Sequence, residues 1–154
     1  MTIVIGIDPD VDKSGIAQLD NELKEMQVSA LPFPLLCAYL QKEKTSAEQS
    51  GKSIIVLIEA GWLNHSNWHL TRGMTIQKAA QIGNATGRNH ETGRKIAEMC
   101  HYFGIPYKLI KPLKKMWKGA DGKITAEEFT RITGCKSRTN QEMRDAGLIA
   151  YFYK

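Results

Sequence analysis

Four acidic residues in three separated segments of the chain could together hold a divalent cation. Asp8 ends one apolar run, Glu59 ends another, and Glu142 and Asp145 lie three residues apart near the C-terminus. Open α/β sheets carry their chemistry at the carboxyl ends of strands, and residues three apart share one helical face. Oxygen ligands suit Mg²⁺ or Mn²⁺ better than zinc. We therefore expect a magnesium or manganese site.

Each of these acids also has a purely structural explanation. A strand-terminal acid such as Asp8 or Glu59 often forms a turn or caps the next segment. Two such acids at adjacent strand ends would repel each other without a cation, which favours the metal site. Glu142 could instead form a capping box with Thr139. Asp145 has apolar neighbours, and an uncompensated acid is expensive to bury among them, so a site role is the better explanation for Asp145.

The elements that must position these acids are predicted from the apolar patterns and the turn residues. The predicted strands are Thr2–Asp8, Ser14–Leu19, Leu23–Ser29, Ile54–Ala60 and Tyr107–Ile110. Helices are expected after the break at Pro32 and Pro34, with residues 42–52 forming a helix end and loop, then over Thr75–Phe103, from a capping box at Thr125–Glu128 to Gly134, and over Asn140–Tyr153. Strands that alternate with helices in this way predict a mixed α/β fold.

The helical stretch Thr75–Phe103 has a face of small residues. Gly83, Gly87 and Gly93 weaken a helix individually, so we expect either close packing of this face or an interruption of the helix. The face around Gly83 and Gly87 would suit a close interface with a second subunit.

Composition limits the class of protein. A chain of 154 residues with 42% hydrophobic residues supports one core, which predicts a single domain over residues 1–154. Cys37, Cys100 and Cys135 are odd in number and far apart, which favours reduced thiols in a cytoplasmic protein over disulfides or zinc ligands. The longest apolar stretch is strand-sized, so neither a signal peptide nor a membrane span is expected.

The positive charge of the chain is concentrated in one stretch. The net charge is +5 and the isoelectric point is near 9.1. One segment carries Trp117 and the lysines Lys108, Lys111, Lys114, Lys115, Lys118 and Lys123. Such a stretch is typical of a surface that contacts phosphate groups. A solvated lysine-rich loop is the alternative.

Two further motifs suggest ligands. His65 and His69 have i, i+4 spacing, but the segment that follows Glu59 is rich in glycine and asparagine, which predicts a loop facing a partner rather than a metal site. Residues 121–128 look like the second half of an EF-hand calcium loop. Trp117 and Gly119 stand where its first carboxylate ligands belong, which disfavours calcium binding.

The ordered set of motifs resembles a known family. Gly6-Ile7-Asp8-Pro9 with Ser14-Gly15, then Ile58-Glu59, then Glu142-x-x-Asp145-Ala146 are similar to the RuvC-like Holliday junction resolvases of the ribonuclease H-like superfamily. Order and spacing agree over essentially the whole chain. The chain departs from the family at Asp10, where glycine is common, and at Glu142, where aspartate is more usual.

The resemblance implies a ribonuclease H-like fold, with a central five-stranded mixed sheet flanked by helices on both faces, and a homodimer that nicks four-way DNA junctions symmetrically. It implies that two Mg²⁺ or Mn²⁺ ions bind in each active site. It implies metal ligands at Asp8, Glu59, Glu142 and Asp145, a catalytic role for Lys123, and DNA contacts at Trp62, Lys114, Lys115, Lys118 and Lys123. The alternative for Trp62 is an ordinary rim aromatic.

Other functions fit the same fold. The chain could be a ribonuclease H-like nuclease for RNA–DNA hybrids or flaps, or a DNA-binding protein that does not cleave. The presence of all four acids argues against the non-catalytic version. An actin-like or sugar-kinase ATPase also begins with an aspartate-containing strand, but it needs a second lobe for which this chain has no room.

Overall fold

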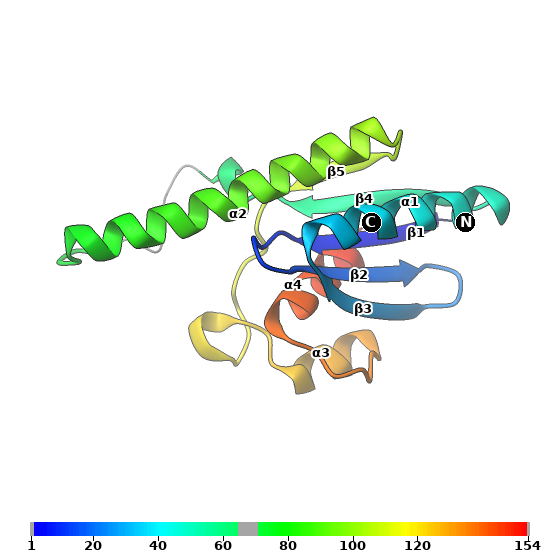
Figure 1. Ribbon diagram of the computed structural model, residues 1–154. Helices are drawn as coiled ribbons and strands as arrows, with labels where there is room; N and C mark the ends of the chain where they lie inside the picture. Colours follow the sequence, from blue (N-terminus) through cyan, green and yellow to red (C-terminus); the bar gives the residue numbers. More distant parts are fainter. Residues whose placement is uncertain (1, 65–70, 154) are drawn as a thin grey trace.

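The computed structural model describes residues 2–64 and 71–153, which form a five-stranded mixed sheet with helices on both faces (Figure 1). The strands are β1 (Thr2–Asp8), β2 (Ser14–Asp20), β3 (Glu25–Leu31), β4 (Ser53–Glu59) and β5 (Tyr107–Ile110). The helices are α1 (Phe33–Gln49), α2 (Ile76–Tyr102), α3 (Ala126–Thr133) and α4 (Gln141–Phe152), with short 3₁₀ turns η1 (Gly61–Leu63) and η2 (Ala120–Gly122). The predicted fold class is confirmed.

The sheet order puts the two acid-terminated strands side by side. The order is β3-β2-β1-β4-β5, with β2 antiparallel to both neighbours and β4 parallel to β1 and β5. In the β1–β4 ladder Ile7 pairs with Ile58. Asp8 and Glu59 therefore follow at adjacent strand ends, as the sequence predicted.

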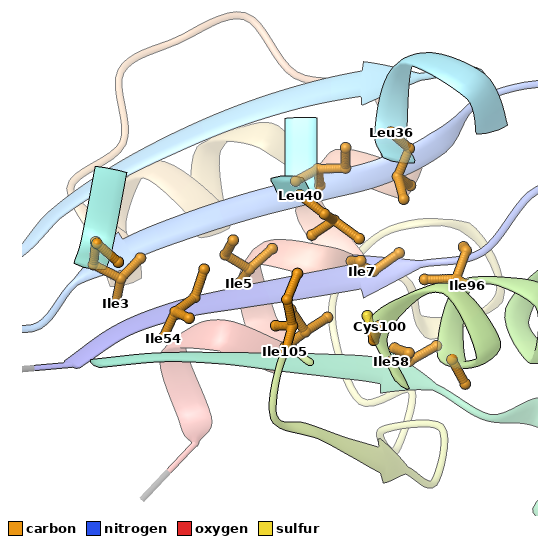
Figure 2. Packing of buried hydrophobic residues seen from close by; sticks show 14 residues of the cluster. Ile3, Ile5, Ile7, Leu36, Leu40, Ile54, Ile58, Ile96, Cys100 and Ile105 are labelled. Carbon is orange, nitrogen blue, oxygen red and sulfur yellow. The ribbon is translucent and has the colours of Figure 1, made fainter. Parts of the chain in front are cut away.

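Alternation along the strands decides which face each side chain reaches. One core lies between the sheet and helices α1 and α2, and it takes Ile3, Ile5 and Ile7 from β1 together with Ile54, Val56 and Ile58 from β4 (Figure 2). The second core, which includes α3 and α4, takes Val4 and Leu57. Because Asp8 has the parity of Val4, and Glu59 that of Leu57, both acids face the side of the sheet that α4 covers.

Two glycines let α4 lie directly on the sheet. A Cβ at Gly6 would overlap the carbonyl of Ala146, and a Cβ at Gly15 would overlap the backbone of Glu142. Gly15 is also the β2 partner of Asp8. The N-terminal turn of α4 is therefore pressed against the sheet beside Asp8.

The predicted start of the first helix was wrong, and so were both predicted ends of the third strand. Helix α1 starts at Phe33 and runs to Gln49, because Pro34 lies in the first turn, where a missing N–H costs nothing. The third strand is shifted to Glu25–Leu31. The turn before it is longer than expected, since the Asp20 carboxylate accepts hydrogen bonds from the backbone N–H groups of Glu22 and Leu23.

Helix α2 is continuous over 27 residues, so its glycines do not interrupt it. Close packing is confirmed only at Gly93, where an added Cβ would lie 2.7 Å from the Trp62 ring. At Gly83 and Gly87 an added Cβ meets no atom within 4 Å in the described part of the chain. All buried residues of α2 lie at or after Gly93, and the N-terminal part of the helix extends beyond the ends of β1 and β4 (Figure 1).

The predicted start and end signals of α3 are confirmed. Helix α3 begins with a reciprocal capping box between Thr125 and Glu128 and ends at Gly134, whose φ is 74°. The three cysteines are free, with Cys100 and Cys135 buried. Within residues 2–64 and 71–153, no helix combines the length and the apolar character that crossing a membrane requires.

Candidate metal centre

Asp8, at the end of β1, is under the electrostatic influence of carboxylates from β4 and α4. Burial is the largest cause that raises the pKa of Asp8 well above its usual value, and the negative charges of Glu59, Asp145, Glu142 and Asp10 raise it further, in that order. The four acids picked out in the sequence therefore act on one another electrostatically. Like charges in a poorly solvated site disfavour simultaneous ionisation, so this group is costly without a counter-charge.

The neighbouring acids are perturbed in the same direction. Burial raises the pKa of Glu59 to about 7, the charge of Asp145 adds to the rise, and the ammonium group of Lys115 opposes it. Burial also raises the pKa of Asp145, against a hydrogen bond from Gln141 and the charges of Lys123, Lys115 and Arg144. Protons or a cation must compensate this charge near neutral pH.

The donor set suits a hard divalent cation, because every candidate ligand is a carboxylate oxygen. The ligands are not gathered round one point, however. Among residues 2–64 and 71–153, no three acidic, histidine or cysteine side chains stand close enough to form a metal-binding group as they are oriented. The fit thus rests on the donor chemistry of the carboxylates and on the charges that act on Asp8.

The structural alternative for Glu142 is wrong. The N-cap of α4 is Asn140, whose Oδ1 accepts a hydrogen bond from the N–H of Met143 at 2.9 Å. Thr139 lies before the cap, so it forms no capping box with Glu142. With that role removed, the position of Glu142 in the first turn beside Gly15 is what puts its charge near Asp8.

Asp10 has a structural role of its own. Its Oδ1 accepts hydrogen bonds from the backbone N–H groups of Asp12 at 2.8 Å and Lys13 at 3.4 Å, which closes the turn between β1 and β2. Its charge still raises the pKa of Asp8, but less than the charges of Glu59, Asp145 and Glu142 do. Asp12 is exposed.

The charges of two lysines of the basic stretch act on the carboxylates. The charges of Lys123 and Lys115 both act on Asp145, and Lys115 also acts on Glu59. The sequence assigned Lys115 only to DNA contact, because nothing in the local pattern shows that its loop folds back. Lys114 and Lys118 are exposed. These two lysines therefore place positive charge near the acids.

Backbone hydrogen bonds stabilise the loop of residues 111–123, which we call the lysine loop. The N–H of Trp117 donates to the carbonyl of Gly122, and that of Gly119 to the carbonyl of Lys123, each at 2.9 Å. The carboxylate of Glu128 accepts from the N–H groups of Thr125 and Lys118 and from the Thr125 hydroxyl. Since these bonds already use the Glu128 carboxylate, the EF-hand interpretation loses its terminal ligand.

Trp62 lies in η1 next to the carboxylates and is half-buried. Its ring packs at Gly93 beside Pro9, the residue that follows Asp8. The Arg94 guanidinium lies 5.0 Å from the ring centroid, and His90 makes an edge contact at 6.0 Å. The rim-packing role is thus realised in part. His65 and His69 lie outside the described residues.

Two polar residues of α4 were not singled out from the sequence. Gln141 donates from Nε2 to Oδ1 of Asp145 at 2.7 Å, and Arg144 donates from Nη2 to Oε1 of Gln141 at 2.9 Å. The i, i+4 spacing of Gln141 and Asp145 and the i, i+3 spacing of Gln141 and Arg144 were the available signals.

No protein-family model matches the chain, and no curated protein is similar to it in sequence. Among solved structures, the chain is similar to T. thermophilus RuvC in complex with Holliday junction substrate. The identity is 17%, the match covers 98% of this chain and 91% of that chain, and the TM-score is 0.46. The chemistry of the site therefore rests on the residues described above.

Proposed function

We propose that this protein is a divalent-metal-dependent endonuclease that acts on branched DNA, most specifically on four-way junctions. One observation carries the proposal: Asp8, Glu59, Glu142 and Asp145 reach one end of the sheet from three elements, and their charges act together on Asp8. Such crowding raises the free energy of the folded protein unless a cation compensates it. A bound cation would remove this destabilisation, which supports a metal-binding role for the four acids.

In this proposal Asp8 is the central ligand, and Glu59, Glu142 and Asp145 complete the coordination of two Mg²⁺ or Mn²⁺ ions. When bound, the ions would activate water for attack on a phosphodiester and stabilise the leaving oxygen. Lys123 and Lys115, whose charges already act on Asp145, would offset the phosphate charge that grows in the transition state.

A basic surface next to an acidic centre supports a nucleic-acid substrate. Lys114, Lys115 and Lys118 are exposed on a loop that adjoins the carboxylates, and they would bind backbone phosphates. Trp62 would contact a base through the part of its ring that Gly93 and Arg94 leave accessible. The specific preference for four-way junctions rests on the order of the sequence motifs.

A homodimer would allow two symmetric cuts. The N-terminal half of α2 would offer a surface for a second subunit, because no atom of the described residues lies within 4 Å of a Cβ added at Gly83 or Gly87, and Ile76 is 88% exposed. Small residues allow close approach of two helices, which is the role the sequence analysis gave them.

The test is incubation of purified protein with a labelled four-way junction, a duplex, a flap and an RNA–DNA hybrid, in Mg²⁺ and in EDTA. We expect paired symmetric nicks confined to the junction and dependent on Mg²⁺. Cleavage of the hybrid or the flap alone would favour the alternative nuclease, and binding without cleavage would favour a non-catalytic DNA-binding protein. Glu22→Gln, at an exposed turn of the sheet, is the charge-matched control for substitutions of the four acids.

A further inference from the structure

A chain of hydrogen bonds runs from the lysine loop through Arg144 and Gln141 to Asp145. Arg144 donates from Nε to the carbonyl of Ile124 at 3.1 Å, and from Nη1 to the carbonyl and the hydroxyl of Thr139 at 3.0 and 3.1 Å. Its Nη2 donates to Oε1 of Gln141 at 2.9 Å, and Nε2 of Gln141 donates to Oδ1 of Asp145 at 2.7 Å. One guanidinium thus joins three segments of the chain.

The chemistry of the groups fixes the direction of this chain. A guanidinium has only donors and an ionised carboxylate only acceptors, whereas a glutamine amide has one acceptor side and one donor side. With Arg144 on one side, the amide oxygen of Gln141 must face the guanidinium, and its NH₂ group must face Asp145. A flipped amide would put donor against donor and acceptor against acceptor at the two ends.

This orientation matters because Asp145 stands among like charges. Its charge acts on both Asp8 and Glu59, and a hydrogen bond limits how far its carboxylate can rotate. The Gln141 amide holds Oδ1, so that Oδ2 remains the free oxygen of the pair. Hydrogen bonds from outside the ligand set commonly orient metal-binding carboxylates in this way.

Arg144 also acts on the other side of the site. Ile124, whose carbonyl it binds, directly follows Lys123, and the charge of Lys123 acts on Asp145. The same guanidinium therefore holds both the segment that carries Lys123 and the amide that orients Asp145.

We propose that Gln141 and Arg144 are positioning residues of the metal centre: Gln141 orients the Asp145 carboxylate toward a divalent cation, and Arg144 fixes the orientation of the Gln141 amide. The inference rests on the proposed function, since it assigns Asp145 as a metal ligand. In the proposed mechanism, Gln141 and Arg144 contact neither the cation nor the DNA.

The first test is Mn²⁺ affinity measured by titration calorimetry on the metal-free protein. Gln141→Leu removes both the acceptor and the donors of the amide and leaves the bonds of Arg144 to Ile124 and Thr139. We expect its Mn²⁺ affinity to fall by about 10–100-fold, as for other groups that orient metal ligands. Gln49→Leu, at the exposed end of α1, is the matched control and should retain wild-type affinity.

A kinetic readout separates positioning from general damage. In Gln141→Leu the KM for junction DNA should stay at the wild-type value, while kcat at limiting Mn²⁺ falls and recovers when Mn²⁺ is raised. A purely structural role would instead lower activity at every Mn²⁺ concentration.

The second test is whether Arg144 acts through Gln141. Arg144→Lys keeps the charge but loses the planar set of donors, so its Mn²⁺ affinity should fall as in Gln141→Leu. In the double variant the two losses should not add, because both remove the same orientation. Arg131→Lys, at an exposed position of α3, is the control. If Arg144→Lys fails to fold, Gln141→Leu alone decides.

The outcomes distinguish this inference from the proposed function. Wild-type binding of Mn²⁺ that Asp8→Asn abolishes but Gln141→Leu leaves unchanged would overturn the positioning role and leave the nuclease proposal standing. A wild-type protein that binds no Mn²⁺ would overturn the metal centre itself.

Discussion

Glu128 and Asp8 are both carboxylates enclosed by the fold, yet their surroundings differ in every respect. Glu128 is 7% exposed and receives hydrogen bonds from Thr125 and Lys118, which lower its pKa, with the Thr125 backbone N–H as the largest cause. Burial and the negative charges of neighbouring acids, Glu59 first among them, raise the pKa of Asp8. The protein thus stabilises the charge of one acid and destabilises that of the other.

The difference separates an acid whose charge stabilises the fold from acids whose charges destabilise it. Glu128 gains by being ionised, because donors converge on it, and it keeps the lysine loop and α3 together. Asp8 and Glu59 lose by being ionised in the metal-free protein. Acids that cost stability at the end of two parallel strands are better explained by binding than by folding.

The largest expected effect comes from removing the charge of Asp8, on which the other acids act. Asp8→Asn should lower metal-dependent junction cleavage by on the order of 10³-fold or more, as loss of an essential group does, while junction binding persists. The same variant should unfold at a higher temperature than wild type in EDTA, because a repelled charge is gone. Both are measured on one preparation, by gel assay and by calorimetry. Wild-type cleavage by Asp8→Asn would remove Asp8 from the mechanism.

The crowding depends on the close approach of α4 to the sheet. Gly15→Ala should destabilise the protein by about 3 kcal/mol, because the methyl group would meet the backbone of Glu142, which is not free to move aside. Gly83→Ala is the matched control, since its Cβ enters open space within a helix. It should stabilise the protein by about 0.5–1 kcal/mol. Denaturant unfolding in EDTA measures both, and equal effects of the two substitutions would contradict the packing described.

The two kinds of acid predict opposite dependences of stability on pH. Glu59 has a folded pKa of about 7 against a usual value of 4.5, so the folded protein binds more protons than the unfolded chain in this range. The stability of the metal-free protein should therefore fall as pH rises from about 4.5 through 7. Glu59→Gln should remove about 1–2 kcal/mol of this loss, whereas the control Glu22→Gln should leave it. Addition of Mg²⁺ should flatten the slope in wild type, and a rising slope in EDTA would contradict the crowding.

Substitution of Glu128 should have the smallest effect on stability. The contribution of Glu128 to stability depends on pH in the opposite direction to that of Glu59. Its pKa is lowered, so its contribution is present above its usual value and lost as pH falls through the folded pKa. Glu128→Gln should lower the melting temperature at pH 7 by on the order of 5 °C, since one amide side turns a donor toward donors. Glu127→Gln, on the exposed neighbour, should have no such effect. A Glu128 variant as stable as wild type would show that the hydrogen bonds contribute little.

The sequence predicted the parts of the fold that depend on local pattern. Apolar runs long enough for strands marked β1 and β4, and the acid at the end of each run marked the edge where they meet. The alternation along β1 puts Asp8 on the face that α4 covers, and the sequence analysis did not predict this face. Boundaries that depend on a competing signal were missed. In the sequence Pro34 predicts a break, although the first turn of a helix accepts proline.

The rest of the site depends on contacts that no local pattern contains. Thr139 and Asn140 are both good caps, and in the structure Asn140 is the N-cap of α4. The return of Lys115 to Glu59 follows from the hydrogen bonds of the loop 117–123. Of the three α2 glycines, the one beside Trp62 is packed, and the sequence could not distinguish it from the other two.

Titration of Mg²⁺ into the metal-free protein near pH 7, in two buffers of different ionisation enthalpy, tests the central claim most directly. Ligands that are partly protonated must release protons when a cation binds. The predicted result is Mg²⁺ binding with measurable proton release, both abolished in Asp8→Asn and retained in Glu22→Gln. Absence of Mg²⁺ binding by wild type, or binding that Asp8→Asn leaves undiminished, would contradict the assignment of these four acids as a metal centre.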